Sequence, residues 1–388
     1  MTVIVHRGTN QIGGCITEIR TESARIFVDM GADLPDWQWN TKTELGIEGV
    51  TVGMADCDAV FITHYHSDHV GRYGEVLADI PIYMGEAARE IFFAVDERLG
   101  GGGGPRILEF KTFRPLDKIV IKDITVTPIL TDHSAFDSYM FLIESGGKKI
   151  LHTGDFRLHG LRGKSVFPAL REHVGEVDLL ITEGTMLSRD NKVRMSESDM
   201  QFFVKKIISH YKYIFILCAS TNIDRMAAVY NAVPPGKYFV CDEYQKGILD
   251  IVTRYSSEVS PAYNFKKVHT YGSNLDEKLR ERGFCMLVRC GEYFSKIMRK
   301  FPDAVFLYSM WEGYWLGKNP SEAVARLTEE FPFQPFHTGG HATKAELEAV
   351  CGVVNPRVGV VPIHSEAPGA LVADCPVILL ENGEEFSF

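Results

Sequence analysis

Three histidines and one aspartate lie close together in the sequence, in the order His64, His66, Asp68 and His69. Neutral imidazoles and carboxylates are the nitrogen and oxygen ligands that suit zinc and related divalent ions. Two ligands spaced i, i+2 on an extended backbone point to the same side, so His64 and His66 can bind one ion. Asp68 and His69 follow the turn and can face a second ion. A polar surface loop is the alternative, but such loops seldom concentrate four ligand-type side chains at this spacing.

The element that must position this cluster is the apolar run before it. Residues 59–62, Ala-Val-Phe-Ile, are short, apolar and partly β-branched, which predicts a buried strand. The cluster therefore follows a strand end, where side chains from several strands can converge on one point. Five further predicted strands each lead into a single ligand-type residue, namely Asp29, His133, Asp155, Glu183 and His364.

The composition is that of a globular protein and limits its classes of function. The chain has 388 residues, is 45% hydrophobic and 24% charged, and has no apolar run near the roughly 20 residues that cross a bilayer, so we expect no membrane contact. Its eight cysteines form no Cys-x-x-Cys pair and the N-terminus does not read as a signal peptide, which predicts reduced thiols in a cytoplasmic protein. A net charge of -10 argues against coating nucleic acid by bulk charge. It leaves room for a nuclease whose positive field is local.

The stretch His64-Tyr65-His66-Ser67-Asp68-His69 resembles the His-x-His-x-Asp-His signature of the metallo-β-lactamase superfamily. The resemblance implies an α/β protein with an αββα sandwich fold and a binuclear hydrolytic centre. It also implies that Asp29 orients a ligand histidine. The ligand sets that it implies are His64, His66, His133 and Asp155 for one ion, and Asp68, His69, the bridging Asp155 and His364 for the other.

A long insertion separates Glu183 from the last two histidines of interest, His341 and His364. Helix-like and strand-like segments alternate within it, which predicts a separate α/β domain with a mostly parallel sheet. Taken singly, either histidine would more often be structural. Their order around an insertion resembles the β-CASP branch of the superfamily, which processes nucleic acids, and residues 219–225 resemble a segment of its ribonuclease J group. The predicted domain ranges are 1–190 and 336–388 for the sandwich and 191–335 for the inserted β-CASP domain.

The narrowed resemblance implies a ribonuclease J-like enzyme that hydrolyses phosphodiester bonds of RNA as a 5′ exonuclease, an endonuclease or both. Two divalent ions, Zn²⁺ first and Mn²⁺ as the alternative, would share a water and lower its pKa. Single-stranded RNA is the expected partner, and a homodimer is compatible with the sequence. The implied catalytic residues are Asp68, Glu183 and His341, of which His341 would donate a proton to the leaving oxygen or hold the scissile phosphate. The implied phosphate-binding residues are Ser220, Arg225, His337 and Thr338.

Three alternatives remain open at this stage. One is a DNA nuclease, and another is a small-molecule hydrolase of the same superfamily that acts on a thioester, a lactone or a phosphodiester. The third is a non-catalytic protein that binds nucleic acid. The insertion and His341 argue against the second, and the full set of ligand-type residues argues against the third.

Overall fold

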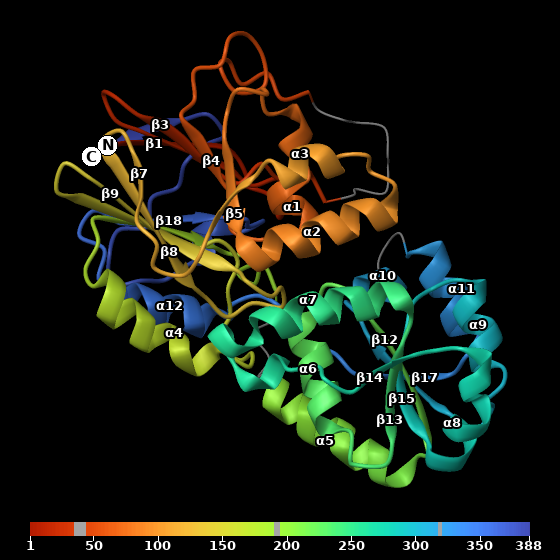
Figure 1. The fold of residues 1–388 in the computed structure, drawn as a ribbon. Helices are drawn as coiled ribbons and strands as arrows, with labels where there is room; N and C mark the ends of the chain where they lie inside the picture. Colours follow the sequence, from red (N-terminus) through yellow and green to blue (C-terminus); the bar gives the residue numbers. More distant parts are fainter. Residues whose placement is uncertain (35–43, 190–194, 317–319) are drawn as a thin grey trace. The chain divides into compact units, whose positions relative to one another are not determined.

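The computed structural model describes residues 1–34, 44–189, 195–316 and 320–388 (Figure 1). The chain forms two compact units. Unit 1 comprises Met1–Leu158, Arg162–Lys192 and Gly340–Phe388, and unit 2 comprises His159–Leu161 and Val193–Gly339. The predicted domain boundary at residues 190 and 191 lies outside the described residues.

Unit 1 contains two sheets whose strands leave the ligand-type residues at their ends. The first sheet has three antiparallel pairings followed by three parallel ones, in the order β19 (Glu385–Ser387), β1 (Thr2–Arg7), β2 (Ile16–Arg20), β3 (Arg25–Val28), β4 (Ala59–Phe61), β5 (Ile82–Gly85) and β6 (Lys111–Phe113). The second sheet has two parallel pairings followed by three antiparallel ones, in the order β18 (Gly359–Ile363), β11 (Leu179–Glu183), β10 (Lys148–His152), β9 (Tyr139–Ser145), β8 (Ile124–Leu130) and β7 (Ile119–Ile121).

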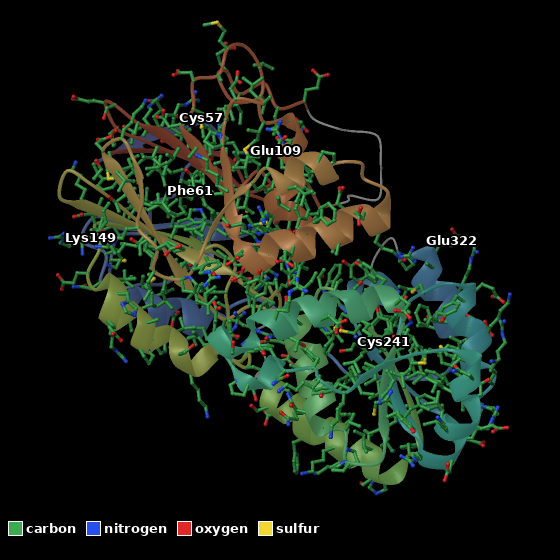
Figure 2. The ribbon with its side chains drawn as sticks, viewed as in Figure 1. Cys57, Phe61, Glu109, Lys149, Cys241 and Glu322 are labelled. Carbon is green, nitrogen blue, oxygen red and sulfur yellow. The ribbon has the colours of Figure 1, made fainter. Side chains whose placement is uncertain are left out.

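The two sheets face each other across one apolar core. Phe61 of the first sheet, labelled in Figure 2, and Phe141 of the second are both fully buried, with ring centroids 5.7 Å apart in an edge-on contact. Side chains alternate along each strand. Ile150 therefore enters the core between the sheets, whereas Leu151 packs in a second core on the outer face. Both faces of the second sheet are buried, which explains its nearly continuous apolar strands.

Helices cover the outer faces of this sandwich and confirm the predicted αββα arrangement. In the described part of unit 1 they are α1 (Ser67–Val70), α2 (Glu86–Leu99), α3 (Gly104–Leu108), α4 (Gly163–Ala169) and α12 (Lys344–Val354). Helix α2 contacts β5 and β6, whereas α12 contacts β11. Helix α2 ends at Leu99, because Gly100 at φ +69° closes its last turn. Within the described residues, no helix is both long and apolar enough to cross a membrane.

A buried ion cluster joins strands β1, β2 and β3 of the first sheet. Glu18 is 1% exposed and accepts hydrogen bonds from Arg25 Nε at 2.9 Å and Arg25 Nη2 at 3.0 Å, and it lies 2.7 Å from His6 Nε2. Burial opposes ionisation of this carboxyl, but the hydrogen bonds from His6 and Arg25 outweigh it and lower the pKa of Glu18 to about 2. The cluster therefore holds an ionised carboxylate inside the sheet at neutral pH.

Unit 2 is built on one sheet whose pairings are all parallel, as the alternating segments predicted. Its strand order is β14 (Val268–Thr270), β13 (Tyr238–Cys241), β15 (Phe284–Val288), β12 (Tyr213–Cys218), β16 (Val305–Ser309) and β17 (Phe333–Pro335). Its described helices are α5 (Glu197–His210), α6 (Ile223–Ala232), α7 (Glu243–Val259), α8 (Asp276–Arg282), α9 (Glu292–Met298), α10 (Gly313–Leu316) and α11 (Glu322–Glu330). Cys241, labelled in Figure 2, is fully buried at the end of β13.

Candidate metal centre

Strand direction explains why residues distant in sequence meet in unit 1. In the first sheet, β3 and β4 run parallel and lead into Asp29 and the residue 63–69 segment. In the second sheet, β8, β10, β11 and β18 share one direction, because β9 is antiparallel to both β8 and β10 while β11 and β18 continue the parallel run. These strands lead into His133, Asp155, Glu183 and His364 at one edge. The carboxyl ends of both sheets therefore supply the centre.

Three of the predicted ligands form one group. Nδ1 of His66 lies 3.1 Å from Nε2 of His64 and 3.2 Å from Nε2 of His133. Nitrogen ligands held at about 2.0–2.1 Å in a tetrahedral site lie roughly 3.3 Å apart. The three rings thus present nitrogen atoms at a spacing that fits one divalent ion. All three nitrogen atoms lie close enough to one another to be ligands of the same ion.

A second group lies beside the first and comprises Asp68, His69, Asp155 and His364. His364 Nε2 is 3.1 Å from Asp68 Oδ2, and His69 Nε2 is 3.3 Å from Asp155 Oδ2. The same Asp155 oxygen is 4.0 Å from His64 Nε2, so this carboxylate lies between the two groups. The structure brings all seven predicted ligands together.

Asp29 fixes the orientation of two histidines, His69 directly and His64 through Thr63. Its carboxylate accepts a hydrogen bond from His69 Nδ1–H at 2.8 Å and from the backbone N–H of Thr63 at 2.8 Å. The Thr63 hydroxyl donates to Asp29 at 2.9 Å, so it accepts from His64 Nδ1–H at 3.0 Å. Nδ1 of each ring is thereby engaged, which leaves Nε2 as the ring nitrogen that can face a metal ion.

Two further proposed ligands, His133 and His364, also have a hydrogen-bond partner at Nδ1. His133 Nδ1–H donates to the backbone carbonyl of Gly340 at 2.8 Å, and His364 Nδ1 forms a 2.7 Å hydrogen bond with Thr185 Oγ1. Partners of this kind orient metal-binding histidines in known sites. Thr63 and Thr185 were not predicted as site residues, because a threonine beside a strand end carries no distinguishing signal in one sequence.

Unpartnered polar atoms in the centre provide a test of whether an ion fits. Nε2 of His69 and Oδ1 of Asp155 are buried and have no hydrogen-bond partner, although their residues are only 1% and 2% exposed. A buried polar atom without a partner costs about 1–3 kcal/mol. Both atoms belong to the second group and are ligand types for zinc, so the residues present fit a divalent ion.

Electrostatics favours the ligand form of the three-histidine group and of Asp68, whereas Asp155 and Asp29 overcome the effect of burial and raise the pKa of His69 well above its ordinary value. Burial and neighbouring imidazoles lower the pKa of His64 and His133 well below its ordinary value, and burial lowers the pKa of His66 to about 4. The three rings are therefore neutral at pH 7, as ligation requires. Burial opposes ionisation of Asp68, but the hydrogen bond with His364 and the charge of His69 hold the pKa of this carboxyl below its ordinary value.

The backbone is unusual at two points of the centre. Asp29 and His364, which follow β3 and β18, have φ values of +62° and +54°. Non-glycine residues in this region are uncommon and often mark functional sites. Gly31 is required for a different reason, since a Cβ added there would lie 1.8 Å from the backbone oxygen of Asp68. The ligand loop therefore packs directly against the backbone after β3.

His341 and Glu183 form a pair at the border of the second group. His341 Nδ1–H donates to Glu183 Oε2 at 3.1 Å and lies 3.4 Å from Asp155 Oδ2. Burial opposes protonation of His341, but Glu183 and Asp155 outweigh it and raise the pKa of this ring to about 9. Glu183 also accepts from the backbone N–H of Phe156 at 3.0 Å. The His341 side chain remains 25% exposed and is the one member of the pair that faces solvent.

The predicted phosphate-binding role of Arg225 is wrong. Its guanidinium is fully buried in unit 2, where it donates to Glu197 at 2.9 and 3.0 Å, to the Ser309 hydroxyl and to the Phe336 carbonyl at 3.1 Å. Its N–H groups are thus directed at protein partners, and it contacts the Phe336 ring at 5.1 Å. Spacing alone could not reveal this, because a Ser-Asn-Arg pattern at a helix start does not indicate whether the arginine side chain is buried.

The hydroxyl of Thr338, a predicted phosphate-binding residue, has a protein partner in this structure. Thr338 is 3% exposed, and its hydroxyl donates to the Met195 carbonyl at 2.6 Å within unit 2. His337 is exposed, and Ser220 is partly exposed with its carbonyl accepting from Gln245 Nε2 at 3.1 Å. The phosphate contacts of His337 and Ser220 therefore stay predictions.

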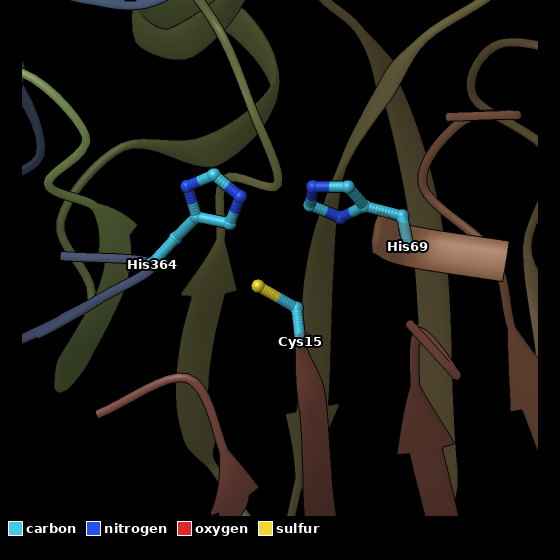
Figure 3. A group of neighbouring side chains, drawn as sticks. All are labelled: Cys15, His69 and His364. Atoms are coloured by element: carbon cyan, nitrogen blue, oxygen red, sulfur yellow. The ribbon is translucent and has the colours of Figure 1, made fainter. Parts of the chain in front are cut away.

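Cys15 is a further residue of the centre that the sequence analysis did not single out. Its thiol belongs to a buried group with His69 and His364, drawn in Figure 3. Burial, followed by the negative charges of Asp155 and Asp29, raises the pKa of this thiol well above its ordinary value. Eight cysteines scattered without a pairing pattern gave no reason to choose this one.

Comparisons with known proteins agree with this arrangement. Residues 25–210 match a family model described as a beta-lactamase superfamily domain. Ribonuclease J of Mycoplasma pneumoniae is 20% identical over 389 residues, covering 92% of this chain and 67% of that protein. Ribonuclease J of Helicobacter pylori strain J99 is 25% identical over 440 residues, covering 97% of this chain and 59% of that protein. The chain thus spans about three fifths to two thirds of the length of these relatives.

The fold has a solved counterpart. A crystal structure of a protein of unknown function from Enterococcus faecalis V583 superposes with a TM-score of 0.80 and 21% sequence identity, covering 99% of each chain. At this identity the likeness concerns the fold alone. It extends over both units, including the parallel sheet of unit 2.

Proposed function

We propose that the protein is a metal-dependent nuclease that hydrolyses phosphodiester bonds of RNA, a proposal supported by the match of residues 25–210 to a beta-lactamase superfamily domain. The observation that carries this proposal is the junction of the two ligand groups at Asp155, with the His341–Glu183 pair beside them. Relatives named ribonuclease J, which align with more than nine tenths of this chain, support the choice of RNA.

We assign one ion to His64, His66, His133 and Asp155, and the other to Asp68, His69, Asp155 and His364. When bound, two divalent ions would supply a water of lowered pKa and offset negative charge at the scissile phosphate. The carboxylate of Asp155 has two oxygens, so it can serve both positions. Zn²⁺ is our first choice for this mixture of nitrogen and oxygen ligands, and Mn²⁺ is the alternative.

His341 is our candidate for handling the leaving group. Its Nδ1–H is engaged by Glu183, which fixes the ring and leaves Nε2 for substrate. In this role Nε2–H would donate a proton to the leaving oxygen or a hydrogen bond to the phosphate. Glu183 acts through His341 and is therefore a positioning residue. Its other oxygen, Oε1, accepts hydrogen bonds from the backbone N–H groups of Phe156 at 3.0 Å and Ala342 at 3.2 Å.

Unit 2 is proposed to be a β-CASP insert, with residues 191–335 as the predicted range. Its parallel sheet and its position in the chain, between Glu183 and His341, support this assignment. We propose single-stranded RNA as the partner, with His337 and Ser220 as remaining candidates for phosphate contacts.

The decisive experiment measures cleavage of end-labelled single-stranded RNA that bears either a 5′ monophosphate or a 5′ triphosphate. The protein is stripped of metal and assayed after addition of Zn²⁺ or Mn²⁺. Release of mononucleotides from the monophosphate substrate alone indicates a 5′ exonuclease, whereas internal fragments from both indicate an endonuclease. Asp68→Ala and His364→Ala should abolish hydrolysis while circular dichroism stays unchanged.

A matched control is His210→Ala, because His210 is an exposed histidine at the end of α5. This variant should retain full activity. Undiminished hydrolysis by Asp68→Ala or His364→Ala would contradict the two-ion assignment. Cleavage of DNA without RNA would redirect the proposal to a DNA nuclease, and turnover of a nitrophenyl ester without either nucleic acid would redirect it to a small-molecule hydrolase.

A further inference from the structure

Cys15 sits at ligand distance from two residues that we assign to the second ion. Its Sγ and a ring nitrogen of each of His69 and His364 all lie within 4.8 Å of one another. The three residues are 2%, 1% and 1% exposed. Figure 3 shows the thiol pointing toward the space between the two imidazole rings, with Cys15 at the end that leads into β2.

The thiol is held by the same backbone bonds as the ligand loop. The Cys15 N–H donates to the carbonyl of Asp68 at 3.1 Å, and the Gly31 N–H donates to the carbonyl of Cys15 at 3.0 Å. On the other side, the His364 N–H donates to the carbonyl of Gly8 at 2.7 Å. A Cβ added at Gly8 would lie 3.5 Å from Cys15 Sγ, so that glycine packs against the sulfur. Cys15 is therefore fixed relative to two proposed ligands.

The ordinary interpretation of a buried cysteine is a small apolar side chain. Cys218, Cys241 and Cys285 fit that interpretation, since each is buried within a strand of unit 2. Cys15 differs from them. Among the described residues it is the only cysteine that belongs to a group of potential metal ligands. Nε2 of its neighbour His69 is buried and makes no hydrogen bond, with Asp155 Oδ2 at 3.3 Å, which independently indicates a ligand at this place.

We propose that Cys15 is an additional sulfur ligand for the ion held by Asp68, His69, Asp155 and His364. The proposal rests on the metal centre of the proposed function. On ligation the S–H bond would break, the sulfur would bond to the ion and the proton would leave to solvent. Thiolate is a soft ligand that zinc accepts readily and that manganese and magnesium do not favour. Cys15 therefore biases this position toward Zn²⁺.

Cobalt substitution of the full chain tests the proposal without measuring activity. The apoprotein is titrated with Co²⁺, whose bond to a thiolate gives a charge-transfer band in the near ultraviolet. The wild-type protein should show the band as the second equivalent binds. Cys15→Ala and Cys15→Ser should lose it while still binding two equivalents. Cys351→Ala is the control, because Cys351 is similarly buried in unit 1 but lies on α12, in the apolar core of the outer sheet face.

Metal affinity provides a second readout. In Cys15→Ser the affinity of the second Zn²⁺ should fall about 10–100-fold, the range measured when a metal site loses a supporting group, whereas Mn²⁺ affinity should change by less than about 3-fold. A wild-type protein that binds two Co²⁺ without the band would overturn the role of Cys15 and leave the proposed nuclease centre standing. Failure of the wild-type protein to bind any ion would overturn both.

Discussion

Replacing Asp29 by asparagine should weaken binding of one ion without touching any proposed ligand. In the native protein the Asp29 carboxylate accepts from His69 Nδ1–H, which leaves Nε2 as the ring nitrogen that can bind a metal ion. Asparagine has nearly the same shape but presents an N–H₂ group on one side. If its oxygen keeps the 2.8 Å bond with the Thr63 N–H, the amide nitrogen faces His69. The imidazole must then move its proton to Nε2 or lose its partner.

The size of the effect follows from these contacts. Loss of a hydrogen-bond partner behind a metal-binding histidine costs 10- to 100-fold in metal affinity, or about 1.4–2.7 kcal/mol. The metal-free protein also loses a hydrogen bond between a buried carboxylate and a buried donor, because Asp29 and His69 are 0% and 1% exposed. We therefore expect its free energy of unfolding to fall by about 1–3 kcal/mol.

Calorimetric titration of the apoprotein with Zn²⁺ measures the first effect, and urea unfolding measures the second. The control is Asp178→Asn. Like Asp29, Asp178 accepts a 2.8 Å hydrogen bond from a backbone N–H, in this case that of Lys149, but it belongs to no potential metal group of the described residues. Unchanged Zn²⁺ affinity in a folded Asp29→Asn variant would refute the reasoning that Asp29 sets the tautomer of His69.

Three further predictions concern the framework around the centre. Glu18→Gln should lower the free energy of unfolding at pH 7 by about 3 kcal/mol, because the folded protein lowers the pKa of this carboxyl from 4.5 to about 2. This stabilisation is fully present above pH 4.5 and disappears as the pH falls to about 2. Urea unfolding between pH 2 and pH 7 checks it, and the exposed control Glu385→Gln should change stability by less than about 0.5 kcal/mol. Gly31→Ala should reduce Zn²⁺ binding and lower the melting temperature because its Cβ would overlap the Asp68 backbone, whereas Gly46→Ala, with no atom within 4 Å of its Cβ, should be silent in both assays. Arg225→Met should destabilise the protein by about 3–5 kcal/mol in chemical unfolding because it removes the buried guanidinium that pairs with the Glu197 carboxylate. An unchanged free energy of unfolding combined with weaker RNA binding would restore the phosphate-binding interpretation.

Local signals predicted those elements that carry their own boundaries. Apolar residues that recur at helical spacing, followed by a glycine run, predict helix α2 at Glu86–Leu99. One continuous apolar run predicts strand β12 at Tyr213–Cys218. Helix α7 at Glu243–Val259 was not predicted, since Gly247 and several β-branched residues lower its helical propensity, and packing on the sheet overrides that propensity. Strands of three residues, such as β14, are too short to show a period.

The same contrast between local sequence signals and packing applies to the candidate site. The ligand-type residues were recognisable because each follows an apolar run, and parallel strands bring such ends to one edge. The sequence could not show how deeply each side chain is buried or in which direction it points. Arg225 resembled a phosphate ligand until its buried partners were seen, and Cys15 resembled any other thiol until the fold placed it beside His69.

The long separation between partners in the centre sets an order of assembly. Asp68 and His364 hydrogen-bond across 296 positions of the chain. During vectorial synthesis, His64, His66 and His133 leave the ribosome long before β18, and non-local pairings form late in folding. The three-histidine position can therefore mature early, whereas the second position waits until all of unit 2 has been synthesised and β18 has joined its sheet. A nascent chain cannot hold all the residues of the proposed two-ion centre, so the proposed activity would arise only with the finished fold.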